Sequence, residues 1–378
     1  MSLTEPRIVA TYHIASDAER IEQRALALAI EQSVECPLEA IGDPAIVANI
    51  VGRVEDVAEL QPGRYAVRIG LAAATAPAEP GQLLNMLFGN SSIQPDIALA
   101  DVELPAHYLT AFGGPRVGLA GIRTLTGAQS RALTASALKP QGLSPAALAS
   151  IAHQLALGGV DLIKDDHGLA DQAFSPFAER AAAVGKAVRE ANAARGGRTL
   201  YAPNISGTLD DMRRQLGVIR DEGIGAVLVA PMIVGVSNFH AIVKEAAGLV
   251  VVAHPAMAGA AKIAAPLLLG RLFRLFGADA TVFPNYGGRF AYSTASCLAL
   301  AQAARDPFGK LNACIPTPAG GIMLQRVNEL LRFYGQDVML LIGGSLLASR
   351  ERLTEQASRF VNKVADYGQR EGHHHHHH

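Results

Sequence analysis

Residues 155–170 of the chain read "LALGGVDLIKDDHGLA", in which an apolar strand signal runs directly into charged groups. The stretch "VDLI" fits a buried β-strand, and it is followed at once by four ionisable residues: Lys164, Asp165, Asp166 and His167. Because successive side chains of a strand point to opposite faces, Lys164 and Asp166 should share one face and Asp165 the other. Burial of a strand does not require charges at its tip, so ion pairing and helix capping compete here with a functional site.

The same alternation recurs along the chain and predicts the fold. From about residue 130, short apolar runs alternate with helical patterns that begin with Ser, Thr or Asp and end in Gly, as capped helices do. The strand candidates are "LTASALKP", "VDLIKDDH", "TLYAPNIS", "AVLVAPMI", "LVVVAHPAM", "ATVFPNY", "LNACIPTPAGG" and "VMLLIGGS". Eight such units in about 240 residues match an α/β fold of the (β/α)8 TIM-barrel type, which typically takes about 250 residues. Their regularity favours closure over an open doubly wound sheet.

The N-terminal third of the chain lacks this regular alternation of strands and helices. "RIVATYHIA" alternates like a half-exposed strand, and "DAERIEQRALALAIEQS" is an amphipathic helix with Asp17 as its expected cap. "VEDVAEL" and "RYAVRIGLAAA" predict a hairpin around "QPG", and "GQLLNMLFGN" predicts a second helix. We therefore expect a small α+β (ferredoxin-like) domain over 1–125, a barrel over 126–370, and a purification tag over 371–378.

Composition narrows the partners and the compartment. The formal net charge is −1 with no basic run, which argues against nucleic acid as a partner. No secretory signal or bilayer-length apolar stretch is present, so neither export nor a membrane is expected. Cys36, Cys297 and Cys314 are widely spaced, as expected of buried thiols in a reducing cytoplasm.

Polar residues fall at the strand ends where barrel enzymes carry their active sites. The first strand ends at Lys139, the third at Asn204 and the fifth at His254. The sixth strand ends at Asn285, with Arg289 close behind. Pairing or capping explains any one of these residues as well as catalysis does, but the convergence of the whole set on one rim favours a site.

Two glycine pairs indicate a phosphate site. Gly320 and Gly321 follow the seventh strand, and Gly343 and Gly344 follow the eighth. Glycine lets backbone N–H groups approach an anion, helix N-termini favour negative charge, and the loops after strands seven and eight often bind phosphate. We therefore expect a phosphorylated substrate.

Three motifs then resemble the Rubisco large-chain family. "GGVDLIKDDH" resembles its "GG-D-KDDE", "LKPQGLS" its "KPKLGLS", and "VVAHPAM" its "HIHRAM", all in register with the glycine pairs and the small leading domain. The departures place the chain among the Rubisco-like proteins (form IV). Gln141 replaces a lysine, Pro255 replaces a phosphate-binding arginine, Ala319 stands for serine, and "FPNYGGRF" replaces the flexible lysine loop. The resemblance therefore implies that carboxylation is lost.

The resemblance also assigns roles to individual residues. Lys164 corresponds to the lysine that takes up CO2 as a carbamate, Asp166 to a Mg2+ ligand, and His167 to a glutamate ligand. The remaining correspondences are Lys139 and His254 as active-site residues, Asn204 as the strand-three asparagine, and Gly320, Gly321, Gly343 and Gly344 as phosphate-binding glycines. In the family a partner subunit completes the site, with Glu31 and Asn90 as the counterparts here, which implies a homodimer.

Without carboxylation, the step of the family's reaction that the resemblance still implies is enolisation of the substrate's ketone. A metal polarises a ketone, a base removes the adjacent proton, and Lys139 and Lys164 are the candidate proton-transfer groups. We expect isomerisation of a phosphorylated ketose such as 5-methylthioribulose 1-phosphate, as in methionine salvage. A salvage enolase is disfavoured, since such enzymes carry a lysine base where Asn90 stands. The alternatives are a decarboxylase (lyase) of a 3-oxo-isoapionate 4-phosphate type substrate, and a non-catalytic sugar-phosphate-binding or regulatory protein.

His167 leaves the metal open, because Mg2+ prefers oxygen ligands and imidazole suits softer ions. Mg2+ with His167 as ligand or bystander, another divalent ion, and a free Lys164 amine acting as base are the three possibilities.

Overall fold

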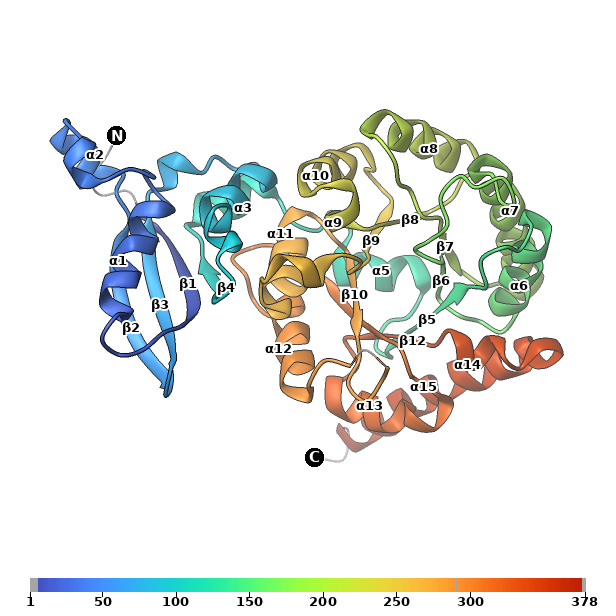
Figure 1. Cartoon of the computed structure of the whole chain (residues 1–378). Coiled ribbons are helices and arrows are strands. Elements are labelled where there is room, and N and C mark those ends of the chain that lie inside the picture. The colour runs from blue at the N-terminus through green and yellow to red at the C-terminus, as the bar shows by residue number, and fades with distance from the viewer. Residues whose placement is uncertain (1–5, 290, 376–378) are drawn as a thin grey trace. The chain divides into compact units, whose positions relative to one another are not determined.

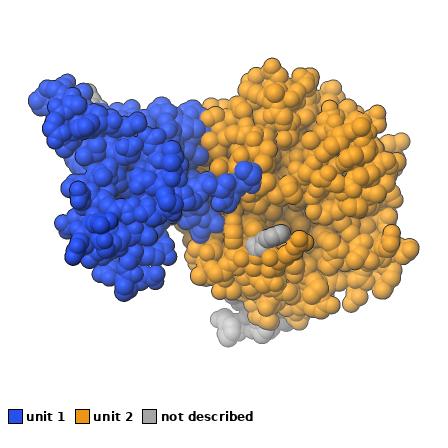
Figure 2. Space-filling view, in the orientation of Figure 1, with its two compact units in different colours: residues 1–113, 257–268, 309–311 blue, residues 114–256, 269–308, 312–378 orange. Residues whose placement is uncertain are grey.

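The structure is a computed structural model that describes residues 6–289 and 291–375 (Figure 1). It divides into two compact units, coloured separately in Figure 2. Unit 1 comprises Met1–Gly113, Met257–Leu268 and Gly309–Leu311, and unit 2 comprises Gly114–Ala256, Leu269–Phe308 and Asn312–His378. The domain boundary expected near residue 125 stays a prediction, and the expected tag lies partly outside the described residues.

Unit 1 is built on an antiparallel sheet with the strand order β2-β3-β1-β4. Its strands are β1 (Ile8–Ala15), β2 (Arg53–Gln61), β3 (Arg64–Leu71) and β4 (Ile97–Glu103), and its helices are α1 (Ile21–Glu31), α2 (Pro44–Asn49), α3 (Pro80–Phe88) and α4 (Ala106–Phe112). β2 and β3 form the expected hairpin. The expected Asp17 cap is wrong in position: Asp17 accepts a hydrogen bond from the Arg20 N–H (2.8 Å) in a turn before α1, and the N-cap Arg20 makes no side-chain cap.

In the part of unit 2 that the structure describes there are eight parallel strands, one in each of the eight expected apolar runs. They are β5 (Leu133–Leu138), β6 (Leu162–Asp165), β7 (Leu200–Ala202), β8 (Ala226–Val229), β9 (Val250–Ala253), β10 (Ala280–Pro284), β11 (Ile315–Ala319) and β12 (Met339–Leu341). Two four-stranded sheets, β12-β5-β6-β7 and β11-β10-β9-β8, are joined by a parallel bridge between Asn204 and Leu228 and by contacts between β11 and β12. The ring of strands closes as an α/β barrel (Figure 1).

Helices lie around the ring, as the helical patterns between the strands predict (Figure 1). They are α6 (Pro145–Leu157), α7 (Phe177–Arg195), α8 (Leu209–Asp221), α9 (Pro231–Val234), α10 (Val236–Glu245), α11 (Phe273–Phe276), α12 (Thr294–Arg305), α13 (Val327–Tyr334), α14 (Gly344–Leu347) and α15 (Leu353–His375). The helix α5 (Gly118–Thr126) instead lies over the middle of the ring in Figure 1, and its Ile122 packs into the apolar cluster of the barrel interior. A π-helical turn, Pro266–Leu272, leads into α11. Among the described residues, no helix is both long and apolar enough to cross a membrane.

The barrel interior fixes which side chains reach its mouth. Alternate residues of the strands form one buried apolar cluster, which includes Leu133 and Ala135 of β5, Leu162 of β6, Ala202 of β7 and Val252 of β9. Residues of the same parity further along each strand continue this inward-facing series. The series therefore delivers polar side chains to one end of the barrel.

Candidate active site

Four of the expected site residues belong to the inward-facing series. Lys139 follows Leu133 and Ala135 in parity, Lys164 follows Leu162, Asn204 follows Ala202, and His254 follows Val252. β5 and β6 are neighbours in which Ala137 is paired with Lys164, so Lys139 lies one side-chain step nearer the mouth. All four residues thus lie at the C-terminal ends of the strands, the end that the sequence predicts.

Lys139 and Asp166 form the central ion pair of the mouth. Lys139 Nζ lies 2.7 Å from Asp166 Oδ1, and Gln141 Nε2 donates to Asp166 Oδ2 at 3.2 Å. Burial alone would raise the pKa of Asp166, but the hydrogen bond and charge of Lys139, with help from Gln141, lower it to about 2. Asp166 is therefore a carboxylate held between two donors.

Lys164 is a buried amine beneath this pair. Its side chain is 4% exposed, and Nζ donates to the backbone carbonyl of Asp165 at 3.2 Å. Burial, followed by the charge of Lys139, lowers the pKa of Lys164 to about 8. About a tenth of the amine is therefore neutral at pH 7, far more than for an exposed lysine, and only the neutral amine can accept a proton or add to CO2.

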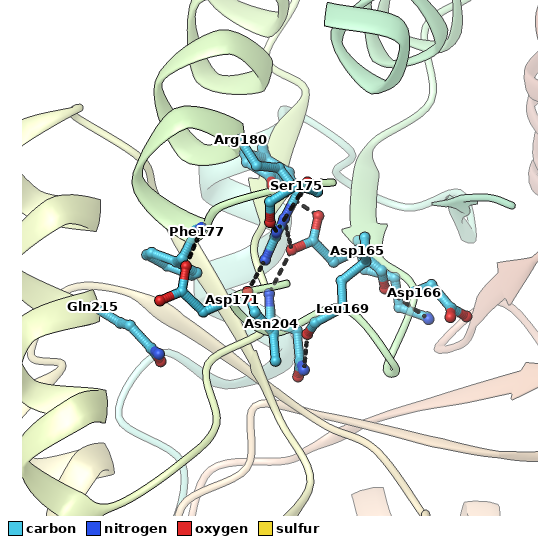
Figure 3. Close-up of polar contacts among 12 residues, drawn as sticks. Asp165, Asp166, Leu169, Asp171, Ser175, Phe177, Arg180, Asn204 and Gln215 are labelled. Atoms are coloured by element: carbon cyan, nitrogen blue, oxygen red, sulfur yellow. Dashed lines mark hydrogen bonds and ion pairs between the residues drawn. The ribbon is translucent and has the colours of Figure 1, made fainter. Parts of the chain in front are cut away.

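Asp165 lies on the opposite face of β6, as the alternation predicts. It is fully buried and accepts hydrogen bonds from Arg180 Nε (3.0 Å), Tyr201 Oη (2.7 Å) and the Asn204 backbone N–H (2.9 Å). Figure 3 shows Arg180 and Asn204 converging on Asp165 while Asp166 points away from them. Arg180 and Tyr201 could not be predicted as partners of Asp165 from the sequence, because no local pattern links positions on β6, α7 and β7.

The same network shapes the loop that carries Asp166 and His167. Arg180 also donates to the carbonyls of Ser175 (2.7 Å) and Ala170 (2.8 Å). The Asn204 amide donates to the carbonyls of His167 (3.1 Å) and Leu169 (2.7 Å) (Figure 3). These bonds fix the orientation of the Asn204 amide and leave its buried Oδ1 without a hydrogen-bond partner. An orphaned acceptor of this kind costs free energy unless a ligand donates to it.

Two imidazoles stack in the mouth. The rings of His167 and His254 lie 4.3 Å apart at an interplanar angle of 12°. Burial lowers the pKa of His167, and burial together with the charge of Lys164 lowers the pKa of His254 to about 2. His254 Nδ1 accepts from the Ala256 N–H at 3.1 Å, so the neutral ring carries its hydrogen on Nε2.

The two glycine loops lie side by side. Ser345 Oγ donates to the carbonyl of Ile322 at 3.1 Å, which ties the loop after β12 to the loop after β11. Open space surrounds the positions that Cβ atoms would take at Gly320 and Gly344, and a Cβ on Gly343 would lie 4.0 Å from Lys139 Cε. Both glycine pairs precede helices: Gly344 begins a single-turn helix directly, and Gly321 is followed by a short 3-10 turn at Leu324–Arg326 and then α13.

The sixth strand contributes less than expected. Asn285 points away from the mouth toward α13, where its Oδ1 accepts from Tyr334 Oη at 2.5 Å. Arg289 is exposed in the loop after β10, next to residue 290, which lies outside the described residues. A role for Arg289 in substrate binding stays a prediction.

Glu31 and Asn90, the residues expected from a partner subunit, lie together in unit 1. Asn90 Nδ2 donates to Glu31 Oε1 at 3.1 Å on the surface, although the two residues are 59 positions apart. The structure thus brings them to a single place, while their contribution to a partner's site stays a prediction.

The donor set determines whether a metal ion fits. Among the described residues, no three His, Cys, Asp or Glu side chains converge in a way that could hold a metal. Asp166 and His167 supply two donors, with Oδ1 and Nδ1 3.7 Å apart. A carboxylate added to Lys164 would be a third, so the site fits a divalent cation once that lysine is carbamylated and Lys139 releases Asp166.

These features define the class of the protein: it is a (β/α)8 barrel whose ionisable residues lie at the C-terminal ends of the strands, as in barrel enzymes. Residues 118–350 match the ribulose bisphosphate carboxylase large chain, catalytic domain. The chain belongs to this family, and proteins named as Rubisco-like are among those to which it is similar.

Three similar proteins match this chain over nearly its full length. Ribulose bisphosphate carboxylase-like protein 1 of Rhodopseudomonas palustris is 64% identical over 98% of this chain and 100% of its own. The 5-methylthioribulose-1-phosphate isomerase of Rhodospirillum rubrum is 53% identical over 95% of this chain and 96% of its own. A crystal structure of a Rubisco-like protein from Rhodopseudomonas palustris is 96% identical, with a TM-score of 0.92 over 97% of this chain and 99% of that one.

Proposed function

We propose that the chain is a ketose-phosphate isomerase that moves protons next to the carbonyl of 5-methylthioribulose 1-phosphate. The observation that carries this proposal is the pair of lysines at the ends of the neighbouring strands β5 and β6: Lys139, which is bonded to Asp166, and the buried Lys164. The relative from Rhodospirillum rubrum, named for this isomerisation and similar over nearly the whole chain, supports the choice of substrate.

The lysines divide the work of proton transfer. The neutral amine of Lys164, or a carbamate oxygen formed on it, is the base that takes the proton from the carbon beside the ketone. The Lys139 ammonium, released from Asp166 as substrate enters, donates to the oxygen on which negative charge develops. The base then returns its proton to the former carbonyl carbon, while the neighbouring hydroxyl gives its proton back to Lys139 and becomes the new ketone, which gives the isomer.

Other residues orient the substrate. The Nε2–H of His254 is a fixed donor and the orphaned Oδ1 of Asn204 a fixed acceptor, which suits a chain of hydroxyl and carbonyl groups. The phosphate is assigned to the open space at the two glycine loops, where backbone N–H groups can approach it. Pro255, in place of a phosphate-binding arginine, suits a substrate with a single phosphate.

A divalent cation, Mg2+ in the family's usual form, would be held by Asp166, His167 and a carbamate on Lys164, and would polarise the ketone. The chain's own contribution is the buried neutral amine that can add CO2. A carbon-13 NMR signal from 13CO2-treated protein, absent in Lys164→Met, tests the carbamate independently of activity.

We further propose that the active unit is a homodimer in which Glu31 and Asn90 of one subunit complete the partner's site. Asn90→Ala and Lys164→Met are each expected to be inactive alone. Mixed after reversible dissociation, they should recover about a quarter of wild-type activity, since half of the dimers then contain one intact site. No recovery from a mixture shown to exchange subunits would contradict the shared site.

Deuterium exchange tests the reaction itself. Incubation of 5-methylthioribulose 1-phosphate with the protein in D2O should place deuterium on the carbons beside the ketone and yield an isomer. If neither deuterium nor isomer appears with Mg2+ and bicarbonate supplied, the isomerase proposal fails. Release of CO2 from a phosphorylated 3-oxo sugar acid would then favour the lyase alternative.

A further inference from the structure

A polar pocket of about 270 Å³ lies at the other end of the barrel, where the strands begin. Its wall includes residues directly before β6 and β7 (Asp161 and Thr199) and, near the start of β5, Arg131. Lys139, Lys164 and Asn204 stand at the far ends of these same three strands. The pocket is therefore separate from the candidate active site.

Its lining carries an excess of positive charge. Three arginines, Arg131, Arg195 and Arg198, face one acidic residue, Asp161, so the formal charge of the lining is 3 − 1 = +2. Asp161 is already neutralised: Arg131 binds both of its oxygens at 2.8 Å, and the Thr134 N–H (2.9 Å) and hydroxyl (3.0 Å) donate to one of them. The remaining positive charge belongs to Arg195 and Arg198.

These two guanidinium groups keep most of their donors available. Within the described residues, Arg198 makes one long hydrogen bond, from Nη1 to the Thr124 carbonyl (3.4 Å), and Arg195 makes none. Capping of the C-terminal end of α7 would explain a basic residue at position 195. It does not explain Arg198, a second arginine in the same pocket for which the described residues supply no acidic partner.

Two glycines make room for Arg195. A Cβ on Gly197 would lie 1.9 Å from Arg195 Nη1, and a Cβ on Gly159 would lie 2.8 Å from Nη2. Any larger residue at either position would push the guanidinium out of its present place. In its present position the exposed Arg195 guanidinium therefore occupies the space beside both glycines, although the φ of +96° at Gly159 favours glycine there by itself.

We propose that this pocket binds a small phosphate-bearing anion, either inorganic phosphate or a short phosphate ester, through Arg195 and Arg198. A guanidinium presents a fork of N–H donors that matches phosphate oxygens, and two such groups in one pocket suit a dianion. The size of the pocket admits a phosphate or a three-carbon ester rather than a nucleotide.

Calorimetric titration of the full chain with inorganic phosphate, and separately with glycerol 3-phosphate, tests the proposal. The double variant Arg195→Gln, Arg198→Gln should bind one phosphate fewer per chain than wild type. Each single variant should weaken that site about ten-fold. Arg189→Gln is the matched control, because Arg189 is exposed on the same helix and bonds to the Glu222 carbonyl outside the pocket.

A charge-neutral variant separates phosphate binding from general electrostatics. Gly197→Ala adds only a methyl group where Arg195 Nη1 now lies, and should weaken the site while leaving net charge unchanged. Tungstate soaked into crystals should give an anomalous peak between Arg195 and Arg198.

This test does not depend on the active-site proposal. If the barrel mouth also binds phosphate, the number of phosphate ions bound per chain should fall from two to one in the double variant. If the mouth binds none, that number should fall from one to zero. Equal phosphate counts and affinities in wild type and the double variant would overturn the inference, as would tungstate absent from the pocket.

Discussion

Asp165 and Asp166 are neighbours in the chain, but their side chains lie in two different environments. Asp165 faces the helical layer, is fully buried, and has Arg180, Tyr201 and the Asn204 N–H as partners. Asp166 faces the mouth, where its partners are the half-exposed Lys139 and Gln141. A carboxylate enclosed by donors from three elements supports the fold, whereas one held by a movable lysine can exchange partners when a ligand arrives. The strand tip therefore has a structural face and a chemical face.

The largest expected effect comes from the chemical face. Lys164→Met should lower kcat by about 10⁴-fold, because the base is lost, while the melting temperature should not fall, because a buried amine becomes apolar. Steady-state kinetics and thermal unfolding measure the two quantities, with Lys186→Met on the surface of α7 as control. Full activity of Lys164→Met would remove this lysine from the mechanism.

The structural face should respond in the opposite way. Asp165→Asn leaves the fully buried Arg180 without its counter-ion, and breaking a buried pair typically costs about 3–5 kcal/mol. Urea unfolding should show this loss as a lower midpoint. A stability equal to wild type would mean that Arg180 does not depend on Asp165.

Asp166→Asn is the matched change on the other face. It should leave the free energy of unfolding within about 1 kcal/mol of wild type, because the Lys139 pair is partly exposed. The same change should lower kcat about 10²-fold, since Asp166 is one of the three groups proposed to hold the divalent cation. If Asp165→Asn and Asp166→Asn affected stability and activity alike, the distinction between the two faces would be lost.

The pH profile should report the chemical face alone. The pKa of Lys164, lowered to about 8 by burial and by Lys139, means that the amine is protonated below that pH and neutral above it. kcat/KM should therefore rise about ten-fold per pH unit up to about 8 and then level off. The pKa values of Asp166 and His254, both about 2, keep these groups in one state throughout. A flat profile between pH 6 and 8 would exclude titration of Lys164.

The smallest expected effect concerns the second donor to Asp166. Gln141→Met removes the 3.2 Å hydrogen bond and keeps the volume, which should lower kcat by about three- to ten-fold. Gly168→Ala should break the same hydrogen bond by displacing the Gln141 side chain, because the new Cβ would lie 1.8 Å from Gln141 Nε2. An unchanged kcat in both variants would show that Lys139 alone holds Asp166.

The strands and their inward-facing residues were predictable because they are periodic. Each of the eight apolar runs contains a strand, and alternation alone placed Lys164 and Asp166 on one face. Partners from distant elements were not predictable, since nothing local connects Asp165 to Arg180 and Tyr201. Asn285 shows why position at the end of a strand is not sufficient to predict a site residue. It follows the C-terminal end of β10, but its place in the alternation points its side chain out of the barrel, where Tyr334 donates a hydrogen bond to it.

The seam of the barrel has a consequence for biosynthesis. β5 pairs with β12, and Ser136 Oγ reaches the Ile342 carbonyl at 2.7 Å across 206 positions of sequence. Lys139 and Gly343 meet at this seam, so a nascent polypeptide cannot acquire a working catalyst until the final strand has left the ribosome and docked against the first. Contacts of such long range fold slowly, and until they form, the facing edges of β5 and β12 leave backbone groups unpaired that can pair with another chain.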